Sequence, residues 1–273
     1  MTEALSKLDR RYLQIALAVI MALPFFVAVE FPMTISPETQ KGFDFIQKLP
    51  EGSLILISYD ASAAGMAEVH PQFNAMLEYS IKRHFRILVV TVWPEGPMLI
   101  EWGFRDTDVF NRLQYGKDFV NLGFIGGSGT GAVPAFAKDI HAMIKVDYYG
   151  NKLETLPMME SINTAKEIAL IYEPCVGGGF TDWLMYVQGV YKTPLYAAVT
   201  AWAAPTAMPY LASGQIVGLN NGLKGAAEFE KLVGARGFGL GGITSLSMAH
   251  LWAVIVIVVG NIVYFATRGK GGK

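Results

Sequence analysis

The chain of 273 residues has a single cysteine and little charge. With Cys175 alone, no intrachain disulfide can form, so packing must stabilise the fold. Asp, Glu, Lys and Arg make up 16% of the chain, whereas a typical soluble domain has about 25%. The formal net charge of −1 gives no reason to expect nucleic acid as a partner. A chain this poor in charge is expected to bury surface against copies of itself, other subunits or a membrane.

The two longest apolar segments lie near the two ends of the chain. Residues 12–29 contain only one polar side chain, Gln14, and residues 248–267 form a second run of similar length. A helix of about 17–25 apolar residues crosses the hydrocarbon core of a bilayer. We therefore predict two transmembrane helices, at residues 12–30 and 248–267. The alternative for the first, a cleaved signal peptide, has a shorter apolar region and an A-x-A-like site, which this run lacks.

Basic residues flank the two predicted spans on their outer ends. Lys7, Arg10 and Arg11 precede the first span, and Arg268, Lys270 and Lys273 follow the second. Short flanks rich in Lys and Arg stay in the cytoplasm. The sequence thus predicts cytoplasmic tails at residues 1–11 and 268–273, and an extracytoplasmic central region on a prokaryotic cell membrane.

The central region alternates apolar strands with helices. Strands are expected at residues 53–59, 86–93, 119–125, 167–172 and 195–201, and helices at 36–48, 71–84, 98–113, 133–143 and 181–190. Continuously apolar strands separated by helices indicate parallel strands covered on both faces. We predict an α/β, Rossmann-like, doubly wound and mostly parallel sheet of about five strands at residues 34–202. Residues 203–247 are rich in glycine, and we expect a closely packed membrane-proximal segment there.

Candidate ligand-binding residues follow the predicted strands. In an open parallel sheet, ligands bind beyond the carboxyl ends of the strands. Asp60, Glu68 and His70 could form a metal site or an acid–base pair there, or could simply serve local structure. The glycine-rich turn at residues 126–131 could hold an anion on its backbone N–H groups. It could also be a plain tight connection, because it has neither the Walker lysine nor G-x-G-x-x-G spacing. The ligand candidates are Asp60, Glu68, His70, Gly126, Gly127, Ser128, Gly129, Thr130, Gly131 and Glu173.

Cys175 follows the fourth predicted strand, where a nucleophile elbow would place a reactive side chain. Its neighbours do not match G-x-S-x-G, and a cysteine nucleophile needs a base, for which only His70 is expected at the same edge. An ordinary small buried residue is the other interpretation. We assign no catalytic residue, and we predict no cofactor and no metal.

A second set of candidates suits contact with other chains. Small residues let backbones approach closely, and an asparagine within a membrane span usually faces another helix. The interface candidates are Gly214, Gln215, Gly218, Gly222, Gly225, Glu228 and Asn261.

Three functions stay open on the sequence. The favoured one is a structural or assembly subunit of a membrane complex, in contact with the lipid bilayer and forming a homo-oligomer or joining other membrane subunits. The alternatives are a membrane-anchored domain that binds or senses a small ligand, and a membrane-anchored hydrolase or transferase. Low charge, apolar ends and the lack of a complete catalytic constellation favour the first.

Overall fold

The structure, a computed structural model, describes residues 9–27, 31–126 and 131–268. It divides into two compact units, one of Met33–Gly239 and one of Met1–Pro32 with Leu240–Lys273. The larger unit contains the sheet, and the smaller unit contains α2 (Arg10–Phe26) and most of α13 (Phe238–Thr267).

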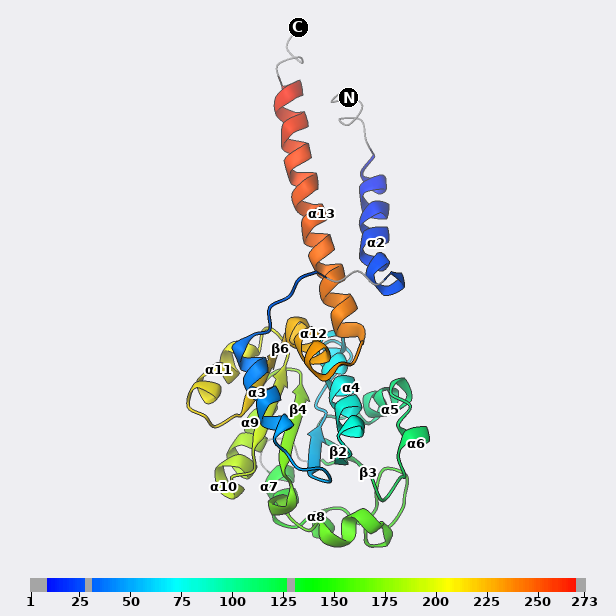
Figure 1. The fold of residues 1–273 in the computed structure, drawn as a ribbon, viewed down its shortest axis with the longest axis vertical. Helices are drawn as coiled ribbons and strands as arrows, with labels where there is room; N and C mark the ends of the chain where they lie inside the picture. Colours follow the sequence, from blue (N-terminus) through cyan, green and yellow to red (C-terminus); the bar gives the residue numbers. More distant parts are fainter. Residues whose placement is uncertain (1–8, 28–30, 127–130, 269–273) are drawn as a thin grey trace. The chain divides into compact units, whose positions relative to one another are not determined.

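The larger unit is built on a six-stranded parallel sheet (Figure 1). The strands are β1 (Leu54–Ser58), β2 (Arg86–Thr91), β3 (Phe119–Phe124), β4 (Leu170–Cys175), β5 (Leu195–Val199) and β6 (Gly218–Asn221). Their order is β3-β2-β1-β4-β5-β6, and every neighbouring pair is parallel. This order is compatible with a Rossmann-like fold, in which the strand order reverses between the first and fourth strands. The parallel α/β prediction is confirmed, with six strands in place of five.

Helices cover both faces of the sheet, with a hydrophobic cluster under each layer. The α4 face is covered by α3 (Pro37–Gln47), α4 (Met66–Lys82), α5 (Gly96–Asp106), α6 (Val109–Arg112) and α12 (Gly222–Val233). The α9 face is covered by α7 (Ala132–Lys138), α8 (Ile140–Met143), α9 (Phe180–Trp183), α10 (Gly189–Tyr191) and α11 (Ala204–Ala212). A π-helix, η4 (Leu184–Gln188), joins α9 to α10, and the short 3₁₀ helices η1 (Leu153–Thr155), η2 (Pro157–Ser161) and η3 (Ala165–Glu167) lead into β4.

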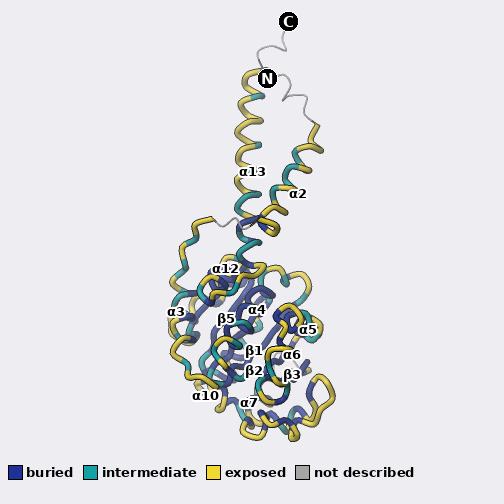
Figure 2. Tube along the Cα trace, turned by 45° about the vertical axis from the view of Figure 1, so that its right-hand side comes forward, coloured by how far each residue is buried: buried dark blue, intermediate teal, exposed yellow. Residues whose placement is uncertain are grey.

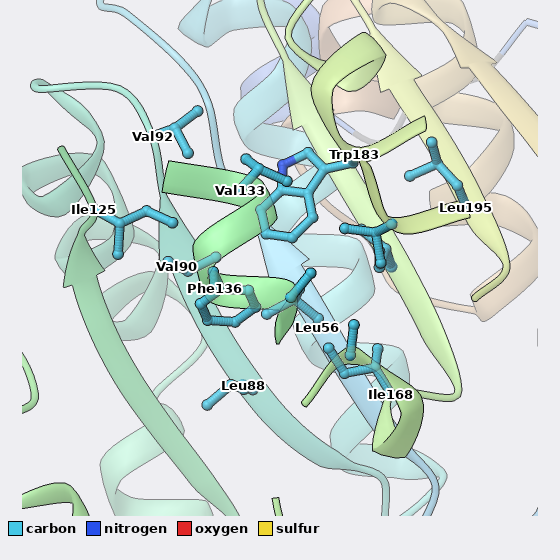
Figure 3. Close-up of a cluster of buried hydrophobic side chains, with 14 of the residues drawn as sticks. Leu56, Leu88, Val90, Val92, Ile125, Val133, Phe136, Ile168, Trp183 and Leu195 are labelled. Atoms are coloured by element: carbon cyan, nitrogen blue, oxygen red, sulfur yellow. The ribbon is translucent and has the colours of Figure 1, made fainter. Parts of the chain in front are cut away.

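The strands are buried along nearly their whole length (Figure 2). On the α9 face, the rings of Phe136 and Trp183 pack edge to face at 5.7 Å between centroids, above Leu56 and Val90 (Figure 3). Truncating a buried aromatic side chain such as Trp183 to alanine removes about 3–5 kcal/mol of stability. Apolar packing therefore stabilises the core, as expected for a chain that cannot form an intrachain disulfide.

The segment after Ala203 is the largest departure from the sequence-based expectation. It forms α11, β6 and α12, and so continues the strand–helix alternation where we expected a closely packed glycine-rich segment. The strand β6 reads Gly-Leu-Asn-Asn, which gives no apolar strand signal. A Cβ added to Gly218 would stand 2.3 Å from the Cα of Gly42, so glycine at both positions allows α3 to lie on this edge strand.

Two boundaries near the candidate residues also differ from the prediction. Helix α4 begins at Met66, so Glu68, His70 and Pro71 lie within it and not in a loop before it. Strand β4 begins three residues later than expected and continues through Glu173 to Cys175. Pairing with β5 across this segment overrides the turn-like sequence Glu-Pro-Cys.

In the smaller unit, α13 is the one helix among the described residues that is long and apolar enough to cross a membrane. It has 30 residues. The second span predicted at residues 12–30 is not shown, because α2 has only 17 residues and Val27 after it is extended. At 1.5 Å per residue, a helix of that length reaches about 26 Å, at the short end of the lengths that cross a bilayer. The side-chain amide of Asn261 donates to Ile257 O of its own helix at 2.9 Å.

Candidate functional site at the carboxyl edge of the sheet

The carboxyl edge between β1 and β4 is where the strand order reverses, and Asp60 lies there. Its N–H donates to Pro174 O at 2.9 Å, and its carbonyl accepts from Val176 N–H at 3.0 Å. These bonds extend the pairing of β1 with β4 and place Asp60 beside Cys175. A Cβ on Gly179 would stand 3.2 Å from Glu173 Oε1 and 3.7 Å from Asp60 Cβ. The glycine-rich loop after β4 therefore covers both acids.

The Asp60 carboxylate is buried and accepts three hydrogen bonds. Ser58 Oγ donates at 2.8 Å to Oδ2, while Thr91 Oγ1 at 3.1 Å and Val92 N–H at 2.7 Å donate to Oδ1. Burial raises the pKa of Asp60, and these hydrogen bonds oppose that effect. Through these hydrogen bonds, the buried Asp60 carboxylate links the end of β1 to the end of β2.

Glu173 is fully buried, and neither of its side-chain oxygens has a donor among the described residues. Burial raises its pKa well above the usual range, and the neighbouring Asp60 charge adds to the effect. Burial and the neighbouring carboxyl group therefore both favour the uncharged, protonated form of Glu173.

Cys175 is buried next to these acids, with its Sγ 3.5 Å from Gly177 O. Burial raises the pKa of the thiol well above its usual range, and the neighbouring Glu173 raises it further. A cysteine nucleophile needs the thiolate form. This environment disfavours that form, and the expected base, His70, bonds elsewhere.

Glu68 and Glu95, a further acid that follows β2, connect neighbouring segments. Glu68 Oε2 accepts from Ala201 N–H at 2.8 Å, and Glu95 Oε2 accepts from Ala63 N–H at 2.9 Å. His70 contacts Tyr59 and Asp106 on the α4 face, so Asp60, Glu68 and His70 do not converge. Among the described residues, no group of three or more His, Cys, Asp or Glu side chains could hold a metal ion. Of the glycine-rich turn, Gly127, Ser128, Gly129 and Thr130 lie outside the described residues, and Gly126 and Gly131 flank them.

Four of the interface candidates lie inside the fold. Gly218, Gly222, Gly225 and Glu228 are buried, whereas Gly214 and Gln215 are exposed. Glu228 accepts hydrogen bonds from Ser36 Oγ at 2.7 Å, Thr39 Oγ1 at 2.8 Å and Lys224 Nζ at 2.6 Å. These four positions therefore pack elements of one chain together and are not exposed to a second chain.

A different surface, which no sequence motif marks, is apolar and exposed. Residues 183–223 contain one charged side chain, Lys192. Helices α9 and α11 touch through Phe180 and Tyr210, whose ring centroids lie 5.9 Å apart. The large apolar side chains exposed here, which we name the α9–α11 surface, are Met185, Val190, Trp202 and Met208, 45–70% exposed. A count of charges along the chain could have found this surface.

None of the three comparisons with known proteins, against family models, curated proteins and solved structures, returned a match. The fold and the site together define a class: a parallel α/β domain with a closed carboxyl edge, followed in the chain by one long apolar helix.

Proposed function

We propose that this protein is an assembly subunit of a membrane complex, in which its α/β domain packs against further copies of the same chain through the α9–α11 surface. The observation that supports this most directly is the exposure of Met185, Val190, Trp202 and Met208 in a stretch of 41 residues with a single charge. Interface centres are depleted of charge and enriched in aromatic residues and methionine. An exposed apolar patch of this kind is unusual on a domain that stays alone in water.

The carboxyl edge of the sheet supports the same proposal. Asp60, Glu68 and Glu95 use their carboxylates to hold neighbouring segments together, and Glu173 is sealed beneath a loop. Acidic side chains that hold segments of the fold together suit a rigid structural subunit.

Helix α13 is the proposed membrane anchor of the subunit. We further propose that residues 12–29 form a second span, that both tails are cytoplasmic and that the α/β domain is extracytoplasmic. The basic residues at both outer flanks support this orientation. Within the smaller unit, Ser245 Oγ donates to Met21 O at 2.7 Å, which is a contact expected of two neighbouring spans.

The assembly proposal is tested by the mass of the full-length protein in mild detergent, corrected for bound detergent. We expect a discrete multiple of the chain mass of 29.8 kDa. Met208→Glu should reduce that mass, because a charge would be buried in the contact. Met98→Glu is the matched control, because Met98 is similarly exposed, 49% against 45%, but lies on α5 of the opposite face.

A monomeric wild type, or a Met208→Glu variant with the wild-type mass, would show that this surface is not the contact. Circular dichroism of both variants separates loss of assembly from loss of folding. Neither substitution should unfold the domain, because both side chains project into solvent.

The orientation is tested with single cysteines and a membrane-impermeant thiol reagent, because the native Cys175 is buried. Glu51→Cys in the α/β domain should react on intact cells. Lys7→Cys and Lys270→Cys should react only after the membrane is opened. Reaction of Lys7→Cys on intact cells would exclude the first span, and protection of Glu51→Cys would reverse the orientation.

Small-ligand binding is the second candidate function, and Glu173 favours it, because a buried carboxyl without a described donor is unusual in a purely structural role. Glu173→Gln should leave the mass of the assembly unchanged. Loss of cellular function with assembly intact would move the function from the surface to this carboxyl pair.

A further inference from the structure

A chain of hydrogen bonds crosses the α4 face from the sheet to the surface. Tyr59 is fully buried and stacked on Phe73, with ring centroids 4.5 Å apart. The Tyr59 hydroxyl lies 2.9 Å from His70 Nδ1, and His70 Nε2 lies 3.2 Å from Asp106 Oδ2. The chain ends at Asp106, whose side chain is 47% exposed.

The direction of these bonds follows from burial. Burial raises the pKa of the Tyr59 hydroxyl, so it keeps its proton and donates to His70 Nδ1. Burial also lowers the pKa of His70, so the neutral ring carries its hydrogen on Nε2 and donates it to Asp106. Asn74 Nδ2 donates to the same Asp106 oxygen at 3.4 Å. Both donors are uncharged, so they orient the carboxylate and leave its negative charge in place.

Asp106 lines a cavity of about 260 Å³ in the larger unit. The cavity lies among α4, the end of α5 and the segment after α12, and its polar lining includes Asn74, Glu78, Asp106, Glu230 and Arg236. Glu78 is already paired with Arg112 Nη1 at 2.6 Å, and Glu230 accepts from Gly239 N–H at 2.8 Å. With Arg112 counted beside the lining Arg236, three carboxylates face two guanidiniums, so one negative charge remains in and around the cavity.

The remaining acceptor of the cavity points to a ligand with several hydrogen-bond donors. Both described hydrogen bonds to Asp106 end on Oδ2, so its Oδ1 is the acceptor that a ligand can use. A group that carries a positive charge and several N–H donors would suit this fixed carboxylate. A metal ion suits the cavity less, because no described set of three His, Cys, Asp or Glu ligands is within reach.

We propose that this cavity binds a primary ammonium group, with Asp106 as its charged partner and His70 as the residue that positions Asp106. The site is separate from the assembly surface and does not depend on it. The ammonium could belong to a soluble amine or to an aminophospholipid headgroup. Phe238, the first residue of the apolar helix α13, lines the cavity, so the headgroup is a source that requires its own test.

The test uses the full-length protein in detergent and ethanolamine as the soluble probe, followed by isothermal titration calorimetry at neutral pH. We expect saturable binding, weakened about tenfold to a hundredfold by Asp106→Asn, the range for a hydrogen bond to a charged group. Asp108→Asn is the matched control. Asp108 is a nearby exposed acid outside the cavity with φ of 52°, a conformation that asparagine also tolerates.

The lipid source is tested by thermal unfolding in nanodiscs that contain phosphatidylethanolamine or only phosphatidylcholine, whose quaternary ammonium has no N–H. A higher unfolding temperature with phosphatidylethanolamine, lost in Asp106→Asn and kept in Asp108→Asn, would identify the headgroup. Ethanolamine binding without this shift would identify a soluble amine. The proposal is overturned if neither probe binds, or if the Asp106→Asn variant binds as the wild type does.

Discussion

The two faces of the sheet differ in how they hold the polar side chains of their strands. On the α4 face, buried Tyr196 donates to Asn220 Oδ1 at 2.6 Å, and Asn220 Nδ2 donates to Tyr172 at 2.9 Å. On the α9 face, the oxygens of Glu173 have no donor among the described residues. A satisfied network specifies packing, whereas an unsatisfied buried group costs stability. Among the strand side chains, those on the α4 face are therefore the better satisfied, and the α9 face contains a titratable group whose burial costs stability.

The largest expected effect comes from breaking the network of the α4 face. Asn220→Leu removes the short hydrogen bonds of the Tyr172 and Tyr196 hydroxyls and leaves them only long bonds, to Gln72 O at 3.4 Å and Thr39 O at 3.3 Å. We expect a loss of about 2–4 kcal/mol in the free energy of unfolding, because each poorly paired buried group costs about 1–3 kcal/mol. Chemical denaturation of the full-length protein in detergent measures it.

Removing the abandoned hydroxyls as well provides the control for this variant. Adding Tyr172→Phe and Tyr196→Phe to Asn220→Leu should restore much of the lost stability, since replacing both partners by apolar groups is nearly neutral. A triple variant as unstable as Asn220→Leu alone would mean that the asparagine acts through its shape and not through these bonds.

The second effect has the opposite sign and concerns the α9 face. Glu173→Gln should stabilise the protein at neutral pH by about 1–3 kcal/mol, because it removes a buried group whose charged form burial disfavours. The wild type should lose stability as the pH rises from the unfolded pKa of glutamate, about 4.3, through the raised folded pKa.

Unfolding curves of the wild type, Glu173→Gln and the exposed control Glu160→Gln over this pH range test the expectation. The wild type and Glu160→Gln should decline together, while Glu173→Gln should decline less. Parallel curves for all three would show that Glu173 is not protonated in the fold.

A smaller effect is expected at Tyr59, the buried end of the hydrogen-bond chain that leads through His70 to Asp106. Tyr59→Phe keeps the ring that stacks on Phe73 but removes the donor to His70 Nδ1. We expect a loss of about 1 kcal/mol in the free energy of unfolding, typical of one hydrogen bond. Nitrogen NMR of His70 should also show a change in the tautomer. An unchanged ring would mean that Tyr59 does not set the proton position.

The smallest effect is expected for Cys175, where the folded protein should be nearly inert. Its thiol is buried with a raised pKa, so thiol reagents should react only as fast as the domain opens. The rate is measured by absorbance with a chromogenic disulfide, with and without denaturant. Fast stoichiometric reaction of the native protein would support the interpretation of Cys175 as a nucleophile.

Local patterns predicted much of the larger unit. Apolar runs such as residues 53–59 and 86–93 are strands because a parallel strand is buried on both faces, and this signal is local in sequence. Strand β6 was missed because its residues are held by distant partners: Asn220 by Tyr172 and Tyr196, and Gly218 by Gly42. No local sequence pattern predicts such contacts between distant segments.

The candidate site shows the same division between local and tertiary information. Placing Asp60 and Glu173 at one edge followed from strand order, but the separation of His70 did not. The sequence suggested a loop before Pro71, whereas α4 begins at Met66 and turns His70 toward Tyr59 and Asp106. Helix packing decided which polar groups meet.

By itself, the sequence determined the parallel α/β class, the absence of an intrachain disulfide and one helix able to cross a membrane, because these depend on residue type, spacing and length. Only the tertiary structure decided the sixth strand, the burial of Asp60 and Glu173 and the cavity at Asp106. Each of these depends on contacts between segments far apart in the chain, and burial there changes what the same side chains do chemically.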